Sequence, residues 1–271
     1  MDAQNVTPMM QQYLSAKQAH PNELLFFRLG DFYEMFFDDA KVAAKELGLT
    51  LTSRSGDLDK SPMCGVPYHA ADSYIARLVA KGFKVAIAEQ IGDPKAKGLT
   101  HREVVKVVTP GTALSDEVLR DASNIYITLL HETNDGTFFL AGADISTGET
   151  FYASYAGEMA AQQILDELYR RMTAELLMTE GFSLADTVRA FLTQRLPHCA
   201  VATVPTIESD ELLAQHFPAA EIPTDAGART AVATLLRYLH DTVMADLSQL
   251  NRLSFLDTRE TMQLDTYTLR N

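Results

Sequence analysis

The chain has 271 residues, of which 46% are hydrophobic and 22% charged, and its formal net charge is −13. This composition is typical of a globular protein, and the length favours two domains over one. No apolar run approaches the roughly 20 residues of a membrane-spanning helix, so we expect no membrane partner. Two cysteines are too few for a disulfide framework, and the N-terminus has no signal-peptide pattern, so we expect a cytoplasmic location.

The first part of the chain is predicted to be a mixed α/β domain. Thr7-Pro8 predicts a helix start, because threonine caps well and proline fits the first turn. Gly30-Asp31 suits a two-residue hairpin turn between two strands. In chain order we expect a helix ending before Pro21, strands at LLFFRL and FYEMF, a helix over 39–47, a strand at LTLTSR, a long Gly/Pro-rich loop over 55–70, a helix over 71–82, and strands at KVAIAEQI and EVVKVVTP.

The second part begins with three strands, at IYITLLHET, TFFLAGADIST and ETFYASYA, joined by turns at Asn134-Asp135-Gly136 and Gly148. The pattern then alternates helix and strand: helices over 158–172, 184–196 and 209–216, with strands at AELLMT and CAVATVP. Three sequential strands followed by this alternation are typical of a ribonuclease-H-like α/β domain. A further helix over 229–244 and a strand-like segment at TMQLDTYTLRN follow. We therefore predict domains at 1–112 and 115–242, with 243–271 starting another region.

Charge divides the chain at the same place. Residues 1–112 hold 13 basic and 13 acidic side chains, whereas residues 113–271 hold 10 basic and 23 acidic ones. Every lysine lies in the first part, and residues 77–106 contain seven basic against three acidic side chains. The net charge argues against a nucleic-acid partner for the whole chain, but the first domain is left free to approach phosphates. A solvated helix face remains the alternative for Arg77, Lys81 and Lys84.

The sequence gives little support to several possible enzymatic functions. The chain contains no Gly-Lys dipeptide, so it has no Walker A nucleotide-binding loop. Cys64 and His69 are only two candidate ligands, too few for a zinc site. Asp144, in a strand of the ribonuclease-H-like part, is the candidate for a metal-dependent nuclease, but such sites need several carboxylates at one strand end. We keep this nuclease as an alternative and expect no enzyme and no metal site.

The segment GDFYEMF carries the most specific hypothesis. On a strand, Phe32 and Glu34 share one face while Tyr33 and Met35 share the other. An exposed aromatic ring could act as a wedge between bases, and the cost of unstacking falls where a base is already mispaired. A carboxylate is repelled by phosphates and by the acceptors of a normal minor groove, so the pair would disfavour sound DNA. A buried Phe32 is the alternative that this pattern leaves open.

The chain resembles the MutS family of mismatch-recognition ATPases. The resemblance covers essentially the whole chain and rests on TPMMQQY, LLFFRLGDFYEMFFDDA, LTLTSR, MCGVPYHA, AIAEQIGDP, VVKVVTPGT and DISTG. It implies that Phe32 stacks on a mispaired or unpaired base and that Glu34 hydrogen-bonds to it. It also implies a mismatch-binding domain over 1–112, a connector over 115–242, and the start of a core and lever region. Further candidates for groove or phosphate contacts are Arg54, Met63, His69, Arg102 and Lys106.

The resemblance also implies partners and a setting. We expect mismatched double-stranded DNA as ligand, MutL as a partner of the connector, a homodimeric parent protein and a cytoplasmic, nucleoid-associated location. The family's ATP and Mg sites are expected to lie outside these 271 residues, so no cofactor is expected here. A protein-docking module that binds almost no DNA in isolation is the alternative to a DNA-binding fragment.

Overall fold

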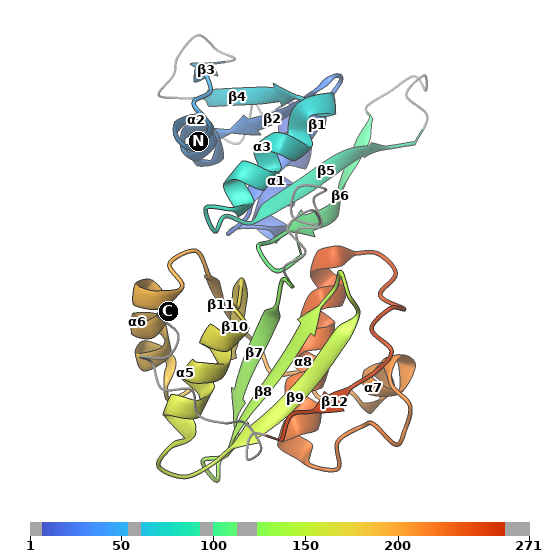
Figure 1. The fold of residues 1–271 in the computed structure, drawn as a ribbon. Coiled ribbons are helices and arrows are strands. Elements are labelled where there is room, and N and C mark those ends of the chain that lie inside the picture. The colour runs from blue at the N-terminus through green and yellow to red at the C-terminus, as the bar shows by residue number, and fades with distance from the viewer. Residues whose placement is uncertain (1–6, 54–60, 93–99, 113–123, 258–271) are drawn as a thin grey trace. The chain divides into compact units, whose positions relative to one another are not determined.

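A computed structural model describes residues 7–53, 61–92, 100–112 and 124–257 (Figure 1). The chain divides into two compact units. The first comprises Met1–Ser123 with the short pieces Pro197–Ala200 and Tyr238–Asp246, and the second comprises Asn124–Leu196, Val201–Arg237 and Leu247–Asn271. Within the described ranges, no helix combines the length and the apolar character needed to cross a membrane.

The first unit is built on a six-stranded mixed sheet with the order β3-β4-β2-β1-β5-β6. Strand β2 is central and antiparallel to both neighbours, β1 and β4, whereas β1 runs parallel to β5. The elements are α1 (Pro8–Ala19), β1 (Leu24–Leu29), β2 (Phe32–Phe36), α2 (Phe37–Leu47), β3 (Thr52–Ser53), β4 (Pro62–Pro67), the 3₁₀ turn η1 (Tyr68–Ala70), α3 (Ala71–Val79), β5 (Val85–Ile91) and β6 (His101–Val108).

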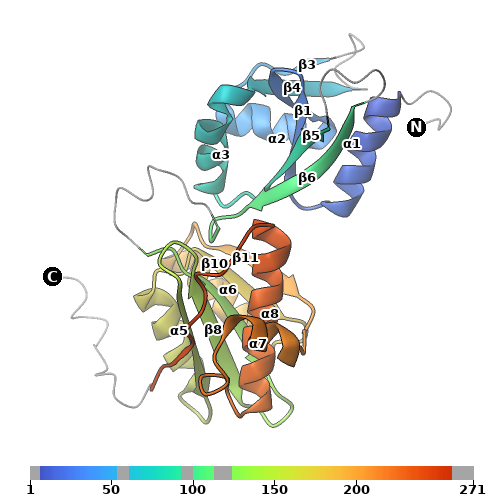
Figure 2. The same cartoon turned by 90° about the vertical axis from the view of Figure 1, so that its right-hand side faces the viewer.

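Helices cover the two faces of this sheet unequally (Figure 2). Helices α2 and α3 pack on one face, where they bury side chains that include Phe26, Tyr33 and Met35. Helix α1 packs on the other face through Tyr13, whose ring makes edge contacts with Phe27 and Phe36. The side chains of β2 alternate between these two cores, so its sequence pattern determines which residues α1 can cover.

A buried carboxylate joins the helices to the sheet behind β2. Asp39, in the first turn of α2, is 6% exposed and accepts hydrogen bonds from the Nζ of Lys17 (2.8 Å), the backbone N–H of Leu25 (3.1 Å) and the hydroxyl of Tyr13 (3.4 Å). A buried carboxylate is tolerated because donors surround it. This contact fixes α1, β1 and the start of α2 to one another, and so fixes the end of β2.

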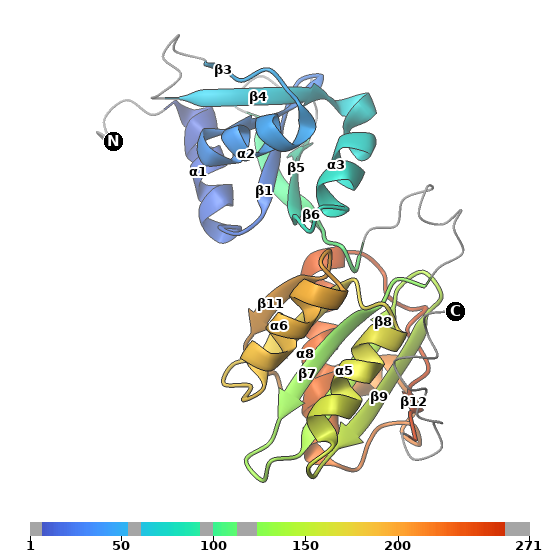
Figure 3. The same cartoon turned by 60° about the vertical axis from the view of Figure 1, so that its left-hand side comes forward.

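The second unit has the predicted ribonuclease-H-like topology. Its sheet order is β11-β10-β7-β8-β9-β12, with β7, β8 and β9 antiparallel and β10 parallel to β7. Helices α5 and α6 lie on one side of this sheet and α8 on the other (Figure 3). The elements are β7 (Ile127–Glu132), β8 (Phe138–Asp144), β9 (Glu149–Tyr155), α5 (Ala160–Arg170), β10 (Glu175–Thr179), α6 (Ala185–Arg195), β11 (Ala200–Val204), α7 (Asp210–His216), α8 (Ala226–Val243) and β12 (Ser254–Phe255).

The prediction of a loop over residues 55–70 is wrong for residues 61–70, which the structure describes. Residues Pro62–Pro67 form strand β4, paired with β2, and Tyr68–Ala70 form a 3₁₀ turn. Proline is compatible with the first residue of a strand, and here the two prolines stand at its ends while burial alternates between them. The strand predicted at LTLTSR shrinks to Thr52–Ser53, and the terminal segment TMQLDTYTLRN lies outside the described residues.

Candidate nucleic-acid interface

The turn that precedes Phe32 forms as predicted. Leu29 pairs with Phe32 across a two-residue loop, and Gly30 at the first loop position has a φ of +60°. A type II′ hairpin turn requires this left-handed conformation at that position, and glycine adopts it without steric cost. The tight turn places Phe32 at the very start of β2.

Phe32 and Glu34 lie on one face of β2, and Tyr33 lies on the other. Phe32 is 46% exposed, Glu34 is partly buried, and Tyr33 is 7% exposed in the core beneath α2 and α3. Helix α1 covers the same face as Phe32 but packs on Phe27 and Phe36, which leaves the turn end open. The predicted shared face, the exposed Phe32 and the inward Tyr33 are therefore confirmed, whereas one carboxylate oxygen of Glu34 is buried; the roles of Phe32 and Glu34 toward DNA remain predictions.

Strand β4 pairs with β2 and lies next to Phe32 and Glu34. Pro67 lies opposite Phe32, Gly65 opposite Glu34, and Met63 opposite Phe36. Met63 is partly buried against the core beneath α1, so it shares the face of Phe32 at the opposite end of β2. Because Gly65 has no side chain, the carboxylate arm of Glu34 can lie across β4. The sequence pattern predicts a loop at β4 and therefore does not indicate this neighbour.

Two of the basic candidates on β6 lie on different faces of the sheet. Arg102 opposes Gln90, and its guanidinium carbon lies 5.4 Å from the ring centroid of Phe27, on the face that carries Phe32. Lys106 opposes Ile87, which packs on the α2 and α3 side. The two residues would share a face in a regular strand, but a bulge between Ile87 and Ala88 shifts the register by one residue.

Arg102 is also held by the fold. Its Nε donates to the backbone oxygen of Arg28 (2.6 Å) and its Nη1 to that of Thr100 (2.9 Å). Burial lowers the pKa of Arg102, but a guanidinium stays charged in proteins. Arg102 therefore brings a fixed positive charge to the Phe32 face, whatever else it contacts.

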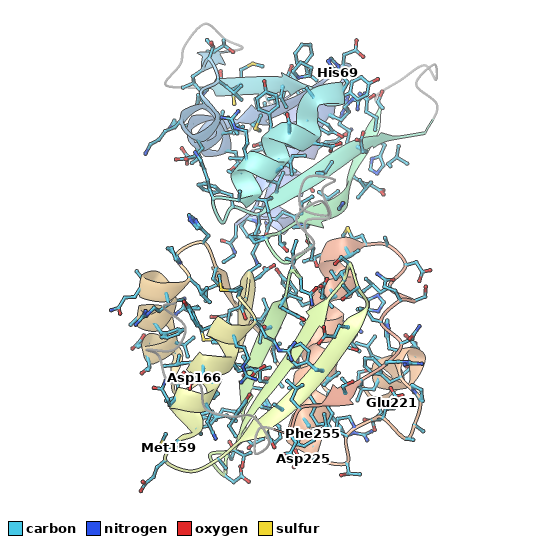
Figure 4. All side chains as sticks on the ribbon, viewed as in Figure 1. His69, Met159, Asp166, Glu221, Asp225 and Phe255 are labelled. Carbon is cyan, nitrogen blue, oxygen red and sulfur yellow. The ribbon has the colours of Figure 1, made fainter. Side chains whose placement is uncertain are left out.

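The remaining candidates are dispersed. His69 is exposed in the turn between β4 and α3 (Figure 4), with its ring 5.8 Å from that of Tyr68. Arg54 lies outside the described residues. Arg77 on α3 donates to the backbone oxygen of Leu47 (3.3 Å), and Lys81, in the turn after α3, pairs with Glu46 (2.8 Å), so both hold the end of α2. Cations at a helix C-terminus are favoured by the helix dipole.

The two candidate metal sites receive little support. Cys64 is buried beneath α2, where its Sγ donates to the backbone oxygen of Ala40 (3.4 Å), whereas His69 is exposed. Asp144 is fully buried, and its Oδ1 accepts from the N–H (2.8 Å) and hydroxyl (2.6 Å) of Ser146, as a turn-forming aspartate does. Among the residues that the structure describes, no three His, Cys, Asp or Glu side chains gather in a way that could hold a metal ion.

Comparison with known proteins agrees with the fold. Residues 7–117 match the family model described as MutS domain I. A protein of Desulforamulus reducens named DNA mismatch repair protein MutS is 42% identical over 276 residues, which cover 98% of this chain and 32% of that protein. A protein of the same name from Brevibacillus brevis is 42% identical over 267 residues, covering 98% of this chain and 30% of that protein.

The chain thus spans about a third of the length of the curated relatives it matches. Among solved structures, the nuclease domain of the large terminase subunit of bacterial virus Sf6 matches 49% of this chain and 64% of that one at 14% identity, with a TM-score of 0.28 that is too low to bear on function. With the MutS domain I match and relatives that align along nearly all its residues, the chain belongs to the MutS family.

Proposed function

We propose that the first unit recognises mismatched double-stranded DNA, with Phe32 stacking on the mispaired or unpaired base and Glu34 hydrogen-bonding to it. The observation that carries this proposal is the placement of the two side chains. Phe32 is 46% exposed at the first position of a central strand, with a carboxylate two residues later on the same face. Family membership supports it, because the relatives are named mismatch repair proteins.

The chemistry favours a defective duplex over a sound one. Inserting an aromatic ring between base pairs costs a few kcal/mol of unstacking, and the cost is lowest where pairing is already lost. Glu34 presents only acceptor atoms when ionised, so it gains a hydrogen bond only from a base that offers an N–H. Arg102, which lies over the ring of Phe27 on the same face of the sheet, supplies a positive charge that would offset repulsion between Glu34 and the phosphates.

The second unit is proposed to act as a connector that relays to the ATPase part of the parent protein and docks MutL. Its support is family membership and the excess of 23 acidic over 10 basic residues in 113–271, which makes phosphate binding there unfavourable. A homodimeric parent protein in the cytoplasm, associated with the nucleoid, belongs to the same proposal. The proposal assigns binding, and no catalytic step, to these 271 residues.

The decisive experiment compares Phe32→Ala with the wild type in the complete gene product. Binding is measured to one duplex with a single mismatch and to its matched counterpart. We expect the variant to lose most of its preference for the mismatch while keeping its affinity for matched DNA. An unchanged preference would refute the proposal. Phe83→Leu, a substitution at a partly buried residue elsewhere in the first unit, controls for a general loss of stability.

A salt titration of the 271-residue chain separates the two readings of the isolated fragment. If the chain makes phosphate contacts by itself, the logarithm of its DNA affinity falls with the logarithm of salt concentration, by about 0.9 for each phosphate neutralised. If it is only a docking module, binding is absent even at low salt. In that case mismatch recognition would require the parent protein.

A further inference from the structure

Both carbonyl groups of the turn before Phe32 are held by side chains or backbone from outside the turn. The Nε of Arg28 donates to the oxygen of Gly30 (2.5 Å), and the backbone N–H of Tyr68 donates to the oxygen of Asp31 (2.9 Å). A two-residue hairpin loop is the place where a β-ribbon frays most easily, because few contacts hold it. Here each of its two residues has a partner.

The two holding groups also contact each other. The guanidinium carbon of Arg28 lies 3.9 Å from the ring centroid of Tyr68, a stacking distance, although Tyr68 is still 46% exposed. An arginine stacked on an aromatic ring gains cation–π attraction without losing its hydrogen bonds in the ring plane. Arg28 and Tyr68 therefore clamp the turn between β1 and the end of β4.

The clamp is anchored to the next strand through Glu89 on β5. Glu89 accepts a hydrogen bond from the hydroxyl of Tyr33, and its second oxygen lies 3.8 Å from the Nη1 of Arg28. The backbone oxygen of Arg28 is in turn held by Arg102 (2.6 Å). Tyr33 stands between Phe32 and Glu34 but on the opposite face, so this network lies directly behind the two residues proposed to meet the base.

We propose that Arg28 and Tyr68 are positioning residues that fix the direction of Phe32, and that mismatch preference depends on their stacked clamp. This inference rests on the proposed function of Phe32. Restacking of the neighbouring bases would push an inserted ring out of the duplex. A flexible turn would let Phe32 move out toward solvent, whereas a rigid turn holds the ring in place. Neither Arg28 nor Tyr68 is required to touch DNA in this role.

Binding measurements on the complete gene product test the inference, with a mismatched duplex and its matched counterpart as probes. Arg28→Met keeps the apolar stem and removes the guanidinium, and Tyr68→Leu removes the ring but keeps the backbone N–H. We expect each to lower the mismatch preference by about tenfold, a mid-range effect for residues coupled through one network. Tyr68→Phe, which retains the stacked ring, should keep the preference.

Salt dependence distinguishes positioning from a direct phosphate contact. If Arg28 positions Phe32, Arg28→Met leaves the salt slope of matched-DNA binding unchanged, and Arg28→Lys fails to restore the preference because an ammonium cannot stack and donate as a planar group. If Arg28 instead binds a phosphate, Arg28→Met weakens both duplexes equally, the slope falls by about 0.9, and Arg28→Lys restores affinity. That second pattern would overturn the inference.

A double mutant links the clamp to the ring. In a Phe32→Ala background, Arg28→Met should cause no further loss of preference, because both changes remove the same interaction. An additional, independent loss would contradict positioning. If Phe32→Ala itself keeps the preference, the proposed function fails; if only the clamp variants keep it, the proposed function stands and this inference fails. Should Arg28→Met not fold, as judged by circular dichroism, Tyr68→Leu at an exposed ring carries the same test.

Discussion

Glu34 and Gly65 face each other across β2 and β4, and there is little room for a side chain at position 65. A Cβ added to Gly65 would lie 3.5 Å from the Cγ of Glu34 and 3.2 Å from the backbone oxygen of Tyr33. The second distance is tighter than nine in ten real contacts of a Cβ atom, so the backbone of β2 at Tyr33 must give by a few tenths of an ångström, whereas the distance to Glu34 is an ordinary contact. A side chain at position 65 would therefore shift the backbone of β2 next to Glu34.

Gly65→Ala should consequently lower the mismatch preference while the first unit remains folded. We expect a stability cost of roughly 1–3 kcal/mol from overpacking, together with displacement of the Glu34 carboxylate. Val66→Ala is the matched control, because Val66 is the next residue of β4 and is fully buried on the opposite face. Binding to both duplexes and thermal unfolding are measured for each. An equal loss of preference in both variants would mean that stability alone explains it.

Glu34→Gln should raise affinity for matched DNA. The amide keeps the shape of the carboxylate but removes the charge that phosphates and minor-groove acceptors repel. A single unit charge near another contributes about 1 kcal/mol in water, which corresponds to an increase of about fivefold. The increase should shrink as salt is raised, because salt screens exposed charges. If matched-DNA affinity is unchanged at low salt, Glu34 does not discriminate against sound DNA by its charge.

The sequence predicts well those structural features that depend on residues close together in the chain. The period of two places Phe32 and Glu34 on one face, and a glycine at the turn fixes where β2 begins; both features are local. What it predicts poorly depends on pairing between distant segments. The segment of β4 predicts a loop because Pro62, Gly65 and Pro67 are unfavourable in strands, although the pairing with β2 overrides that preference.

The basic residues show the same limit. Arg102 and Lys106 are four residues apart and would share a face on a regular strand, yet a bulge in the pairing with β5 separates them. The contact of Arg28 with Tyr68 joins β1 to the end of β4 and cannot be read from either segment alone. A single arginine in the apolar run LLFFRL was the available signal, since a charge within a buried strand needs a partner.

The second unit should lose stability in mild acid because of His131. This side chain is buried on β7 with its Nδ1 3.2 Å from the hydroxyl of Thr179, and burial lowers the pKa of His131 despite the nearby carboxylates of Glu132 and Glu208. The folded state therefore prefers the neutral ring. Its contribution is fully present above the unfolded pKa of about 6.5 and is lost as pH falls through the lower folded value.

Urea unfolding of the 271-residue chain at about pH 7.5 and about pH 5.5 checks this dependence. His131→Gln keeps a side chain able to hydrogen-bond Thr179 but does not titrate in this range. The variant should lose less stability than the wild type between the two pH values. An equal loss in both proteins would show that His131 does not cause the acid sensitivity.

The two cysteines should differ sharply in reactivity. Cys64 is 2% exposed, and burial raises the pKa of its thiol to about 11, whereas Cys199 is partly exposed. Only about one thousandth of Cys64 would be thiolate at a pH near 8, and the thiolate is the reactive form. Iodoacetamide followed by peptide mapping should therefore label Cys199 in the folded protein and both cysteines after denaturation. Similar labelling rates in the folded state would contradict the buried position of Cys64.

Gly142→Ala should destabilise the second unit, because Gly142 on β8 lies directly beneath the ring of Phe151 on β9. A Cβ added there would lie 2.7 Å from the Cε2 and 2.8 Å from the Cε1 of that ring. The ring of Phe151 cannot move away freely, because the guanidinium of Arg171 stacks on it, with its carbon 3.6 Å from the ring centroid. We expect a loss of roughly 1–3 kcal/mol in the free energy of unfolding, measured by denaturant unfolding.

Gly142→Ala combined with Phe151→Leu should recover part of that loss relative to the sum of the single changes, because the smaller side chain admits the new methyl group. Strict additivity of the two changes would show that the clash with Phe151 is not what requires glycine at this position.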